Sequence, residues 1–142
     1  MATTSTARTH WQGSLTEGSG KTELATSGTA TFDVTWSARA EAGSGTTNPE
    51  ELLAAALATC YSMALSHALA GAGNPPTSLD TTVGVTYQPG TGITGATIHV
   101  VGSVPGITAE TFAEFAEKTK TECPVSQALS GIEKTLEVTF NG

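Results

Sequence analysis

The chain has 142 residues, enough for one ordinary domain with a sizeable core, and we expect a single domain over residues 1–142. A net charge of −7, with 13% charged residues, leaves no basic surface to neutralise phosphates, so we expect no nucleic-acid partner. We expect no membrane-spanning segment, because no stretch of predominantly apolar residues looks long enough to cross a bilayer. We also expect a cytoplasmic location, because no apolar signal region follows a basic start.

The N-terminal part of the chain predicts short strands joined by turns. Residues 8–15 form one candidate strand, and the glycine-rich turn signal "TEGSGK" follows at 16–21. "GTATFDVTWSA" at 28–38 alternates polar and apolar residues, several of them β-branched, as a strand does. "EAGSGTTNP" at 41–49 predicts a loop.

A long helix is predicted from Asn48 onward. Asparagine is a good N-cap, and Pro49 suits the first helical position. Gly71 or Gly73 is the expected stop. Almost no polar face remains between these ends, and a helix that is apolar all round is covered on every side. In so small a chain this pattern predicts a central helix, covered in part by a second subunit.

The remaining chain predicts a hairpin, two helices and a last strand. Thr108 is placed to cap a helix, which Pro124 ends because proline disfavours helical geometry at Cys123. Strands, helix, strands, helices and strand, in that order, predict an α+β fold with a largely antiparallel sheet. The expected elements are an antiparallel hairpin over 79–104, helices over 109–122 and 124–130, and a strand over 134–140.

Two cysteines, Cys60 and Cys123, stand out in these elements. A free cysteine in an alanine-rich helix is usually a small buried hydrophobe, and position alone favours that interpretation for Cys60. Cys123 directly precedes Pro124 at an expected helix N-cap, where backbone N–H groups would lower the pKa of its thiol. The competing interpretation is a cysteine tolerated in a bend. Because structural disulfides are rare in the cytosol, a cytosolic pair is more often catalytic, redox-active or unpaired.

Metal and hydrolase chemistry fit the sequence poorly. Zinc usually takes four ligands in close pairs, whereas the cysteines and the three histidines are scattered, so we expect no metal. His67 shares a helix face with Cys60, but seven residues of rise separate them by about 10 Å, too far for a direct base. No GxSxG motif of a serine hydrolase is present.

Arginine is scarce, and Arg39 is placed near the long helix. The chain has two arginines, Arg8 and Arg39, and Arg39 precedes the loop that leads to Glu50. A guanidinium can keep a nearby thiolate ionised, and it pairs with carboxylates in planar geometry. The plainer interpretation is a surface charge at a strand end.

Four segments together resemble the OsmC/Ohr family of osmotically inducible and organic hydroperoxide resistance proteins, from about Trp36 to the C-terminus. In that family an arginine completes the site. The Ohr branch carries it in the first hairpin turn, which here reads "LTEGSGK" and has none, whereas Arg39 matches the OsmC branch. Ala40 departs from the aromatic residue usual after that arginine, so the wall of the site differs. The segments are "TTNPEELLAAALATCYSMALSHAL" (46–69), "PPTSLDTTVGV" (75–85), "SVPGIT" (103–108) and "CPVSQAL" (123–129).

The resemblance implies a thiol-dependent peroxidase with an OsmC-like fold and an intertwined homodimer. Cys60 matches the peroxidatic cysteine, Cys123 the resolving one and Glu50 the glutamate that orients the arginine. The implied reaction reduces an organic hydroperoxide through a Cys60 sulfenic acid and a Cys60–Cys123 disulfide, which a lipoyl-type dithiol regenerates, without metal or cofactor. The helix-cap argument makes Cys123 the more acidic thiol, whereas the resemblance makes Cys60 attack first, and we follow the resemblance.

Helix geometry adds a prediction about the assembly. Ten residues separate Glu50 from Cys60, which is about 15 Å of helical rise, and their side chains point in different directions. We therefore expect Arg39 and Glu50 to act on Cys60 of a partner subunit.

Two alternative functions remain open. The chain could be a hydroperoxide sensor or small apolar-ligand binder on the same fold, or a structural protein with two inert cysteines.

Overall fold

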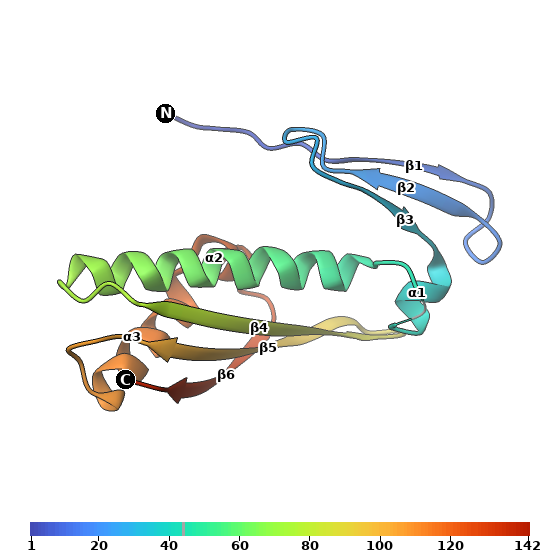
Figure 1. The fold of residues 1–142 in the computed structure, drawn as a ribbon. Helices are drawn as coiled ribbons and strands as arrows, with labels where there is room; N and C mark the ends of the chain where they lie inside the picture. Colours follow the sequence, from blue (N-terminus) through green and yellow to red (C-terminus); the bar gives the residue numbers. More distant parts are fainter. Residues whose placement is uncertain (44) are drawn as a thin grey trace. The chain divides into compact units, whose positions relative to one another are not determined.

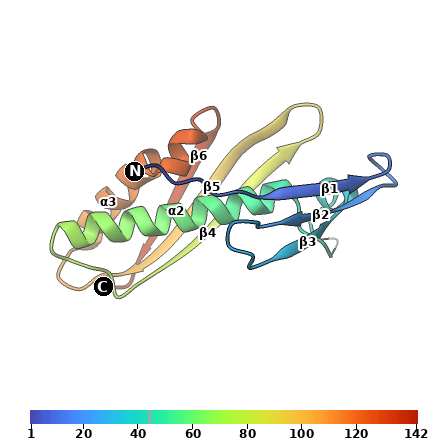
Figure 2. The same cartoon turned by 90° about the horizontal axis from the view of Figure 1, so that it is seen from above.

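The computed structural model describes residues 1–43 and 45–142 (Figures 1 and 2). Contacts between residues divide the chain into two units, Met1–Leu52 and Leu53–Gly142. The expectation of one domain over residues 1–142 stays a prediction. Each unit is described by itself below.

The N-terminal unit contains a three-stranded antiparallel sheet in the order β1-β2-β3. The expected strand at 28–38 is shorter than predicted, because Trp36–Ala40 forms the short helix α1. Two alanines in "WSARA" suit a helix better than a strand. The alternation of polar and apolar residues in the preceding strand led to the prediction that the strand continues through these residues. The strands are β1 (Arg8–Gln12), β2 (Ser19–Glu23) and β3 (Thr31–Val34).

Helix α2, Pro49–Gly71, begins and ends as the sequence predicts. Asn48 Oδ1 accepts a hydrogen bond from the backbone N–H of Glu51 at 2.8 Å, which caps the first turn. At the other end Gly73 adopts a φ of 87°, a left-handed conformation that glycine reaches without strain. The backbone N–H of Asn74 then bonds to the carbonyl of Leu69 at 2.9 Å and closes the last turn.

Helix α2 was expected to be covered by other parts of the protein on every side, but in the single chain only one face is buried. One row of side chains, four residues apart, is fully buried: Leu57, Tyr61, Leu65 and Leu69. The opposite face, with Met63 at 69% exposure, is open in the single chain. By length and composition α2 could cross a membrane, so the expectation of no such stretch is wrong. The core helix of a globular protein passes the same test, and one row of α2 side chains does belong to the core, although only 22% of its most apolar stretch is buried in the single chain.

The C-terminal unit holds a second sheet in the order β4-β5-β6, with α2 running alongside β4 and β5 (Figures 1 and 2). The predicted antiparallel hairpin is present as β4 (Ser78–Gln88) and β5 (Gly92–Ser103). Strand β6 (Glu133–Phe140) pairs with β5 in parallel, which the sequence did not indicate. Parallel neighbours need a crossover connection, and the helices between β5 and β6 supply it.

Those helices are α3 (Ala109–Glu122) and α4 (Pro124–Ala128). Thr108 Oγ1 accepts from the backbone N–H of Thr111 at 3.1 Å and caps α3 as predicted. Phe112 of α3 is fully buried, and its ring lies 5.3 Å from that of Phe140 on β6. This contact joins α3 to the sheet within the hydrophobic core.

Gly102 of β5 lies directly beneath the Phe112 ring. A Cβ at Gly102 would sit 2.2 Å from Phe112 Cζ, so Gly102→Ala forces a fully buried ring to move. We expect this substitution to lower the free energy of unfolding by about 1–3 kcal/mol, measured by urea denaturation. Gly84→Ala on β4 is the matched control, because nothing lies within 4 Å of its Cβ. Equal unfolding midpoints for the two variants would contradict the packing described here.

Candidate active site

The two thiols, far apart in the sequence, meet in the C-terminal unit. Cys60 lies on α2 and is half-buried, whereas Cys123 sits between α3 and α4 and is 1% exposed. The two thiols lie near each other, and the Cys60 side chain raises the pKa of the Cys123 thiol. A reagent from solution can therefore reach Cys60, while Cys123 lies behind it.

Burial raises the pKa of the Cys123 thiol above its ordinary value. The backbone N–H of Ser126 and, more weakly, that of Val125 act in the opposite direction, and the neighbouring Cys60 sulfur adds to the increase. The expectation that the helix N-terminus makes Cys123 the more acidic thiol is therefore wrong. The N–H groups are present as predicted, but the loss of solvent around the sulfur outweighs them.

The "CPVSQ" segment holds Cys123 through contacts to the end of α3. Cys123 has the extended ψ of 142° that a following proline favours, and its backbone N–H bonds to the Thr119 carbonyl at 3.1 Å. The hydroxyl of Ser126, 1% exposed, donates to the Lys120 carbonyl. Gln127 Nε2 donates to the Glu122 carbonyl at 3.0 Å. The polar side chains after the proline thus bind carbonyls that α3 leaves without helical partners.

Cys60 is positioned by the residues that follow it on α2. Tyr61 is fully buried, and its hydroxyl donates to the Ala116 carbonyl of α3 at 2.8 Å. Ser62 Oγ donates to Thr81 Oγ1 of β4 at 2.7 Å. These bonds fix the rotation of α2 about its axis at the point where Cys60 faces Cys123. The bond from Tyr61 to Ala116 joins residues 55 positions apart, so the sequence offered no local signal for it.

The charged pair predicted from the sequence lies in the N-terminal unit. Arg39 Nε donates to Glu50 Oε1 at 2.8 Å, with side-chain exposures of 32% and 8%. Glu50 Oε2 is buried without a hydrogen-bond partner in the described part of the chain. A buried carboxylate oxygen in that state is an acceptor for a group from outside the single chain.

Asn48 connects α1 to the start of α2. While its Oδ1 caps α2, its buried Nδ2 donates to the Ala38 carbonyl at 2.9 Å. Ala38 directly precedes Arg39, so one side chain fixes the backbone beside the arginine and the first turn that carries Glu50. The N-cap was predictable from the sequence, whereas the bond to Ala38 depends on the tertiary fold.

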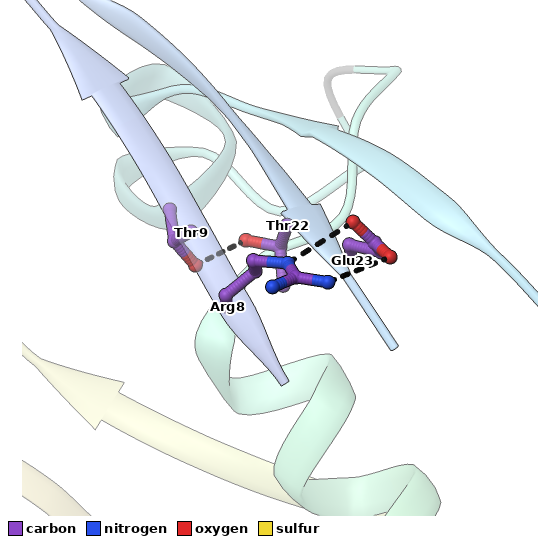
Figure 3. Close-up of polar contacts among 4 residues, drawn as sticks. All are labelled: Arg8, Thr9, Thr22 and Glu23. Carbon is purple, nitrogen blue, oxygen red and sulfur yellow. Dashed lines mark hydrogen bonds and ion pairs between the residues drawn. The ribbon is translucent and has the colours of Figure 1, made fainter. Parts of the chain in front are cut away.

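The other arginine, Arg8, has quite different surroundings. It pairs with Glu23 across the first two strands, at 3.3 Å from Nε to Oε2, beside the Thr9–Thr22 hydroxyl contact (Figure 3). Both charged side chains of this pair are exposed, at 70% and 40%. Such pairs contribute little to stability, and this one faces solvent. Arg39 differs because its carboxylate partner is buried.

An apolar cavity of about 380 Å³ lies against Arg39 within the N-terminal unit. Its lining is mainly hydrocarbon and aromatic, the kind of surface that takes up an apolar group. The sequence had no pattern to indicate it, because the lining comes from strands, loop and helix. Besides Arg39, the main lining residues are Trp11, Leu15, Val34, Trp36, Pro49 and Leu52.

Cysteine and histidine side chains are also common metal ligands. Within residues 1–43 and 45–142, no three His, Cys, Asp or Glu side chains gather closely enough to share an ion. His99 Nε2 instead lies 3.3 Å from Thr139 Oγ1, on neighbouring strands. The candidate groups are therefore a thiol pair in one unit, and an arginine–carboxylate pair beside a cavity in the other.

Comparison with known proteins identifies relatives over nearly the whole chain. Peroxiredoxin OsmC of Escherichia coli is 42% identical over 123 residues, covering 84% of this chain and 85% of that protein. A solved organic hydroperoxide resistance protein from Elizabethkingia anophelis is 28% identical, with a TM-score of 0.70 over 99% of this chain and 100% of its own. OsmC from Legionella pneumophila, at 24% identity, matches with a TM-score of 0.77 over 98% of both chains.

These matches confirm the predicted α+β, OsmC-like fold and the resemblance drawn from the sequence motifs. The family model described as "OsmC-like protein" matches residues 41–138, which include both cysteines and Glu50. Arg39 lies just outside the matched segment. The chain therefore belongs to the family of OsmC-like proteins.

Proposed function

We propose that this chain is a cysteine-based peroxidase that reduces organic hydroperoxides to alcohols. The observation that carries the proposal is the pair of neighbouring thiols, in which Cys60 is half-buried and Cys123 is fully buried. The relative named peroxiredoxin OsmC supports a peroxidase, and the neighbour named an organic hydroperoxide resistance protein supports the substrate class.

In the first step the Cys60 thiolate attacks the distal oxygen of the hydroperoxide. A sulfur–oxygen bond forms, the oxygen–oxygen bond breaks, and the departing alkoxide takes up a proton to leave as alcohol. Cys60 is oxidised by two electrons to sulfenic acid, and the peroxide is reduced by two. Because Cys123 is buried and burial raises the pKa of its thiol, the half-buried Cys60 is the sulfur that a substrate can reach for this attack.

In the second step the Cys123 sulfur attacks the sulfur of the Cys60 sulfenic acid. The disulfide bond forms, the sulfur–oxygen bond breaks, and hydroxide leaves with the Cys123 proton as water. An external dithiol of the lipoyl type then reduces the disulfide and becomes a disulfide itself. The contact between the two thiols supports this route, since little movement is needed to bond them.

Arg39 and Glu50 supply the charge that the first step requires. The guanidinium would stabilise the thiolate and the negative charge that develops on the peroxide oxygens. Glu50, held by Arg39 Nε at 2.8 Å, would fix the orientation of that group. The apolar cavity beside Arg39 would take the hydrocarbon part of the substrate, which hydrogen peroxide lacks.

We further propose that the charged pair acts on Cys60 of a partner subunit in a homodimer. Glu50 and Cys60 are ten positions apart on the continuous helix α2, about 15 Å of rise. The exposed face of α2 and the unpartnered Glu50 Oε2 both support a second chain.

The first prediction concerns turnover. With dihydrolipoamide as reductant, we expect rapid reduction of cumene hydroperoxide, slower reduction of hydrogen peroxide, and no turnover in Cys60→Ser, because the nucleophile is lost. Initial rates from reductant oxidation measure this. Turnover that survives in Cys60→Ser would assign the attack to Cys123 instead. A wild type that forms the disulfide without turnover would indicate a hydroperoxide sensor. Thiols that stay unchanged would indicate a structural protein with two inert cysteines.

The second prediction concerns Arg39. Arg39→Met keeps the apolar stem but removes the charge, so we expect kcat/KM for cumene hydroperoxide to fall about 10²–10³-fold. Arg8→Met is the matched control, because Arg8 pairs with an exposed carboxylate, and we expect its rate to stay within about twofold. Equal rates for the two variants would remove Arg39 from the mechanism.

The third prediction tests the partner arrangement by mixing inactive chains. If Arg39 serves the partner's thiol, a dimer of one Cys60→Ser chain and one Arg39→Met chain contains one intact site. Random mixing after unfolding and refolding should then restore about a quarter of the wild-type activity, since half the dimers are mixed. Activity that stays at the level of the separate variants would show that each chain uses its own Arg39. A fully active monomer would exclude the partner arrangement.

A further inference from the structure

Lys134, the second residue of β6, points its ammonium group at the end of α4. Its Nζ donates to the carbonyls of Leu129 at 2.9 Å, Ser126 at 3.1 Å and Ile132 at 3.5 Å. The side chain is half-buried. An ammonium group has three donors, and here all three directions meet backbone carbonyls.

These contacts matter because α4 is too short to be stable by itself. It has five residues, and backbone N–H groups after the helix bind its last carbonyls, that of Leu129 binding Ser126 at 3.1 Å. Lys134 adds a second, charged donor to the carbonyls of Ser126 and Leu129. A cation at the C-terminal end of a helix binds those carbonyls and opposes their partial negative charge. The base of Lys134 is rigid, because β6 pairs there with β5 in the register Lys134–Ala96, and Ala96 is buried. The sheet thus holds α4 in place through one side chain.

Ser126 connects the Lys134 contact to the resolving cysteine. Its carbonyl accepts from Lys134, its backbone N–H bonds to the Cys123 sulfur, and its hydroxyl holds the Lys120 carbonyl of α3. One residue therefore joins the ammonium group, the buried thiol and the preceding helix. A shift of α4 away from Lys134 would move the N–H that faces the thiol.

We propose that Lys134 is a positioning residue for the resolving step, holding α4 so that Cys123 stays within bonding reach of the oxidised Cys60. The proposal rests on the peroxidase function proposed above. In the step concerned the Cys123 sulfur bonds to the sulfur of the Cys60 sulfenic acid, and hydroxide leaves with the Cys123 proton as water. Disulfide geometry is strict, with sulfurs about 2.05 Å apart, so a loosened α4 slows this step and leaves the first one unaffected.

The consequence of a slow second step is a longer-lived sulfenic acid. A second hydroperoxide molecule can then oxidise Cys60 to sulfinic acid, which the dithiol does not reverse. Lys134 would in this way protect the enzyme from inactivation by its own substrate.

The test follows a single turnover in Lys134→Met, which keeps the apolar stem and loses the donors. After one equivalent of cumene hydroperoxide, mass spectrometry measures the loss of peroxide, the disulfide, and Cys60 sulfenic acid trapped by dimedone. We expect unchanged peroxide consumption, disulfide formation slowed about 10- to 100-fold, and more sulfinic acid at excess peroxide. Lys134→Arg, which keeps the charge and donors, should recover most of the rate.

Lys118→Met is the matched control, because Lys118 is an exposed lysine on α3. It should form the disulfide at the wild-type rate. A Lys134→Met variant that forms the disulfide at the wild-type rate would overturn the positioning role. If Lys134→Met does not fold, Lys134→Gln, which keeps a shorter donor, carries the same expectations. A wild type that consumes peroxide without forming the disulfide would overturn the proposed mechanism as well.

Discussion

The packing of one apolar face of α2 against the C-terminal core determines where the two thiols lie. Leu57, Tyr61 and Leu65 are fully buried, and the Tyr61 hydroxyl bonds to Ala116 of α3. Cys60 is next to Tyr61, and α3 ends at Cys123. The contact that holds α2 against α3 therefore also brings the sulfurs together. A non-directional hydrophobic interaction supplies the stability, and a few hydrogen bonds set the rotation of the helices.

Burial then makes the two thiols chemically unequal. Two backbone N–H groups favour the thiolate of Cys123, but the loss of solvent around that sulfur raises its pKa overall. Cys60, half-buried on the other side of the contact, remains reachable. A peroxidase that uses two cysteines in sequence needs this difference in solvent access. The first cysteine must contact the substrate, and the second must react only after the first is oxidised. In the proposed mechanism, the order in which the two cysteines react depends on access to solvent rather than on a helix dipole.

The few charged side chains near the candidate groups are each bound to a specific partner. Arg39 pairs with a buried carboxylate whose second oxygen is without a partner in the described chain, and Lys134 binds three carbonyls at the end of α4. Removing Arg39 would leave the buried Glu50 carboxylate without this partner, which costs more than losing a surface pair. The exposed Arg8–Glu23 pair is the internal comparison for this difference.

The sequence by itself determined the elements whose signals are local. Asn48 and Gly73 set the ends of α2, Thr108 and Pro124 those of α3, and alternation marked the β4–β5 hairpin. The motifs also identified the family, and with it the two cysteines. The tertiary structure alone decided that β6 is parallel, that the Tyr61 hydroxyl reaches Ala116, and that burial raises the pKa of Cys123. Each of these depends on contacts between residues distant in the chain, or on the solvent that packing removes, and neither is encoded in neighbouring residues.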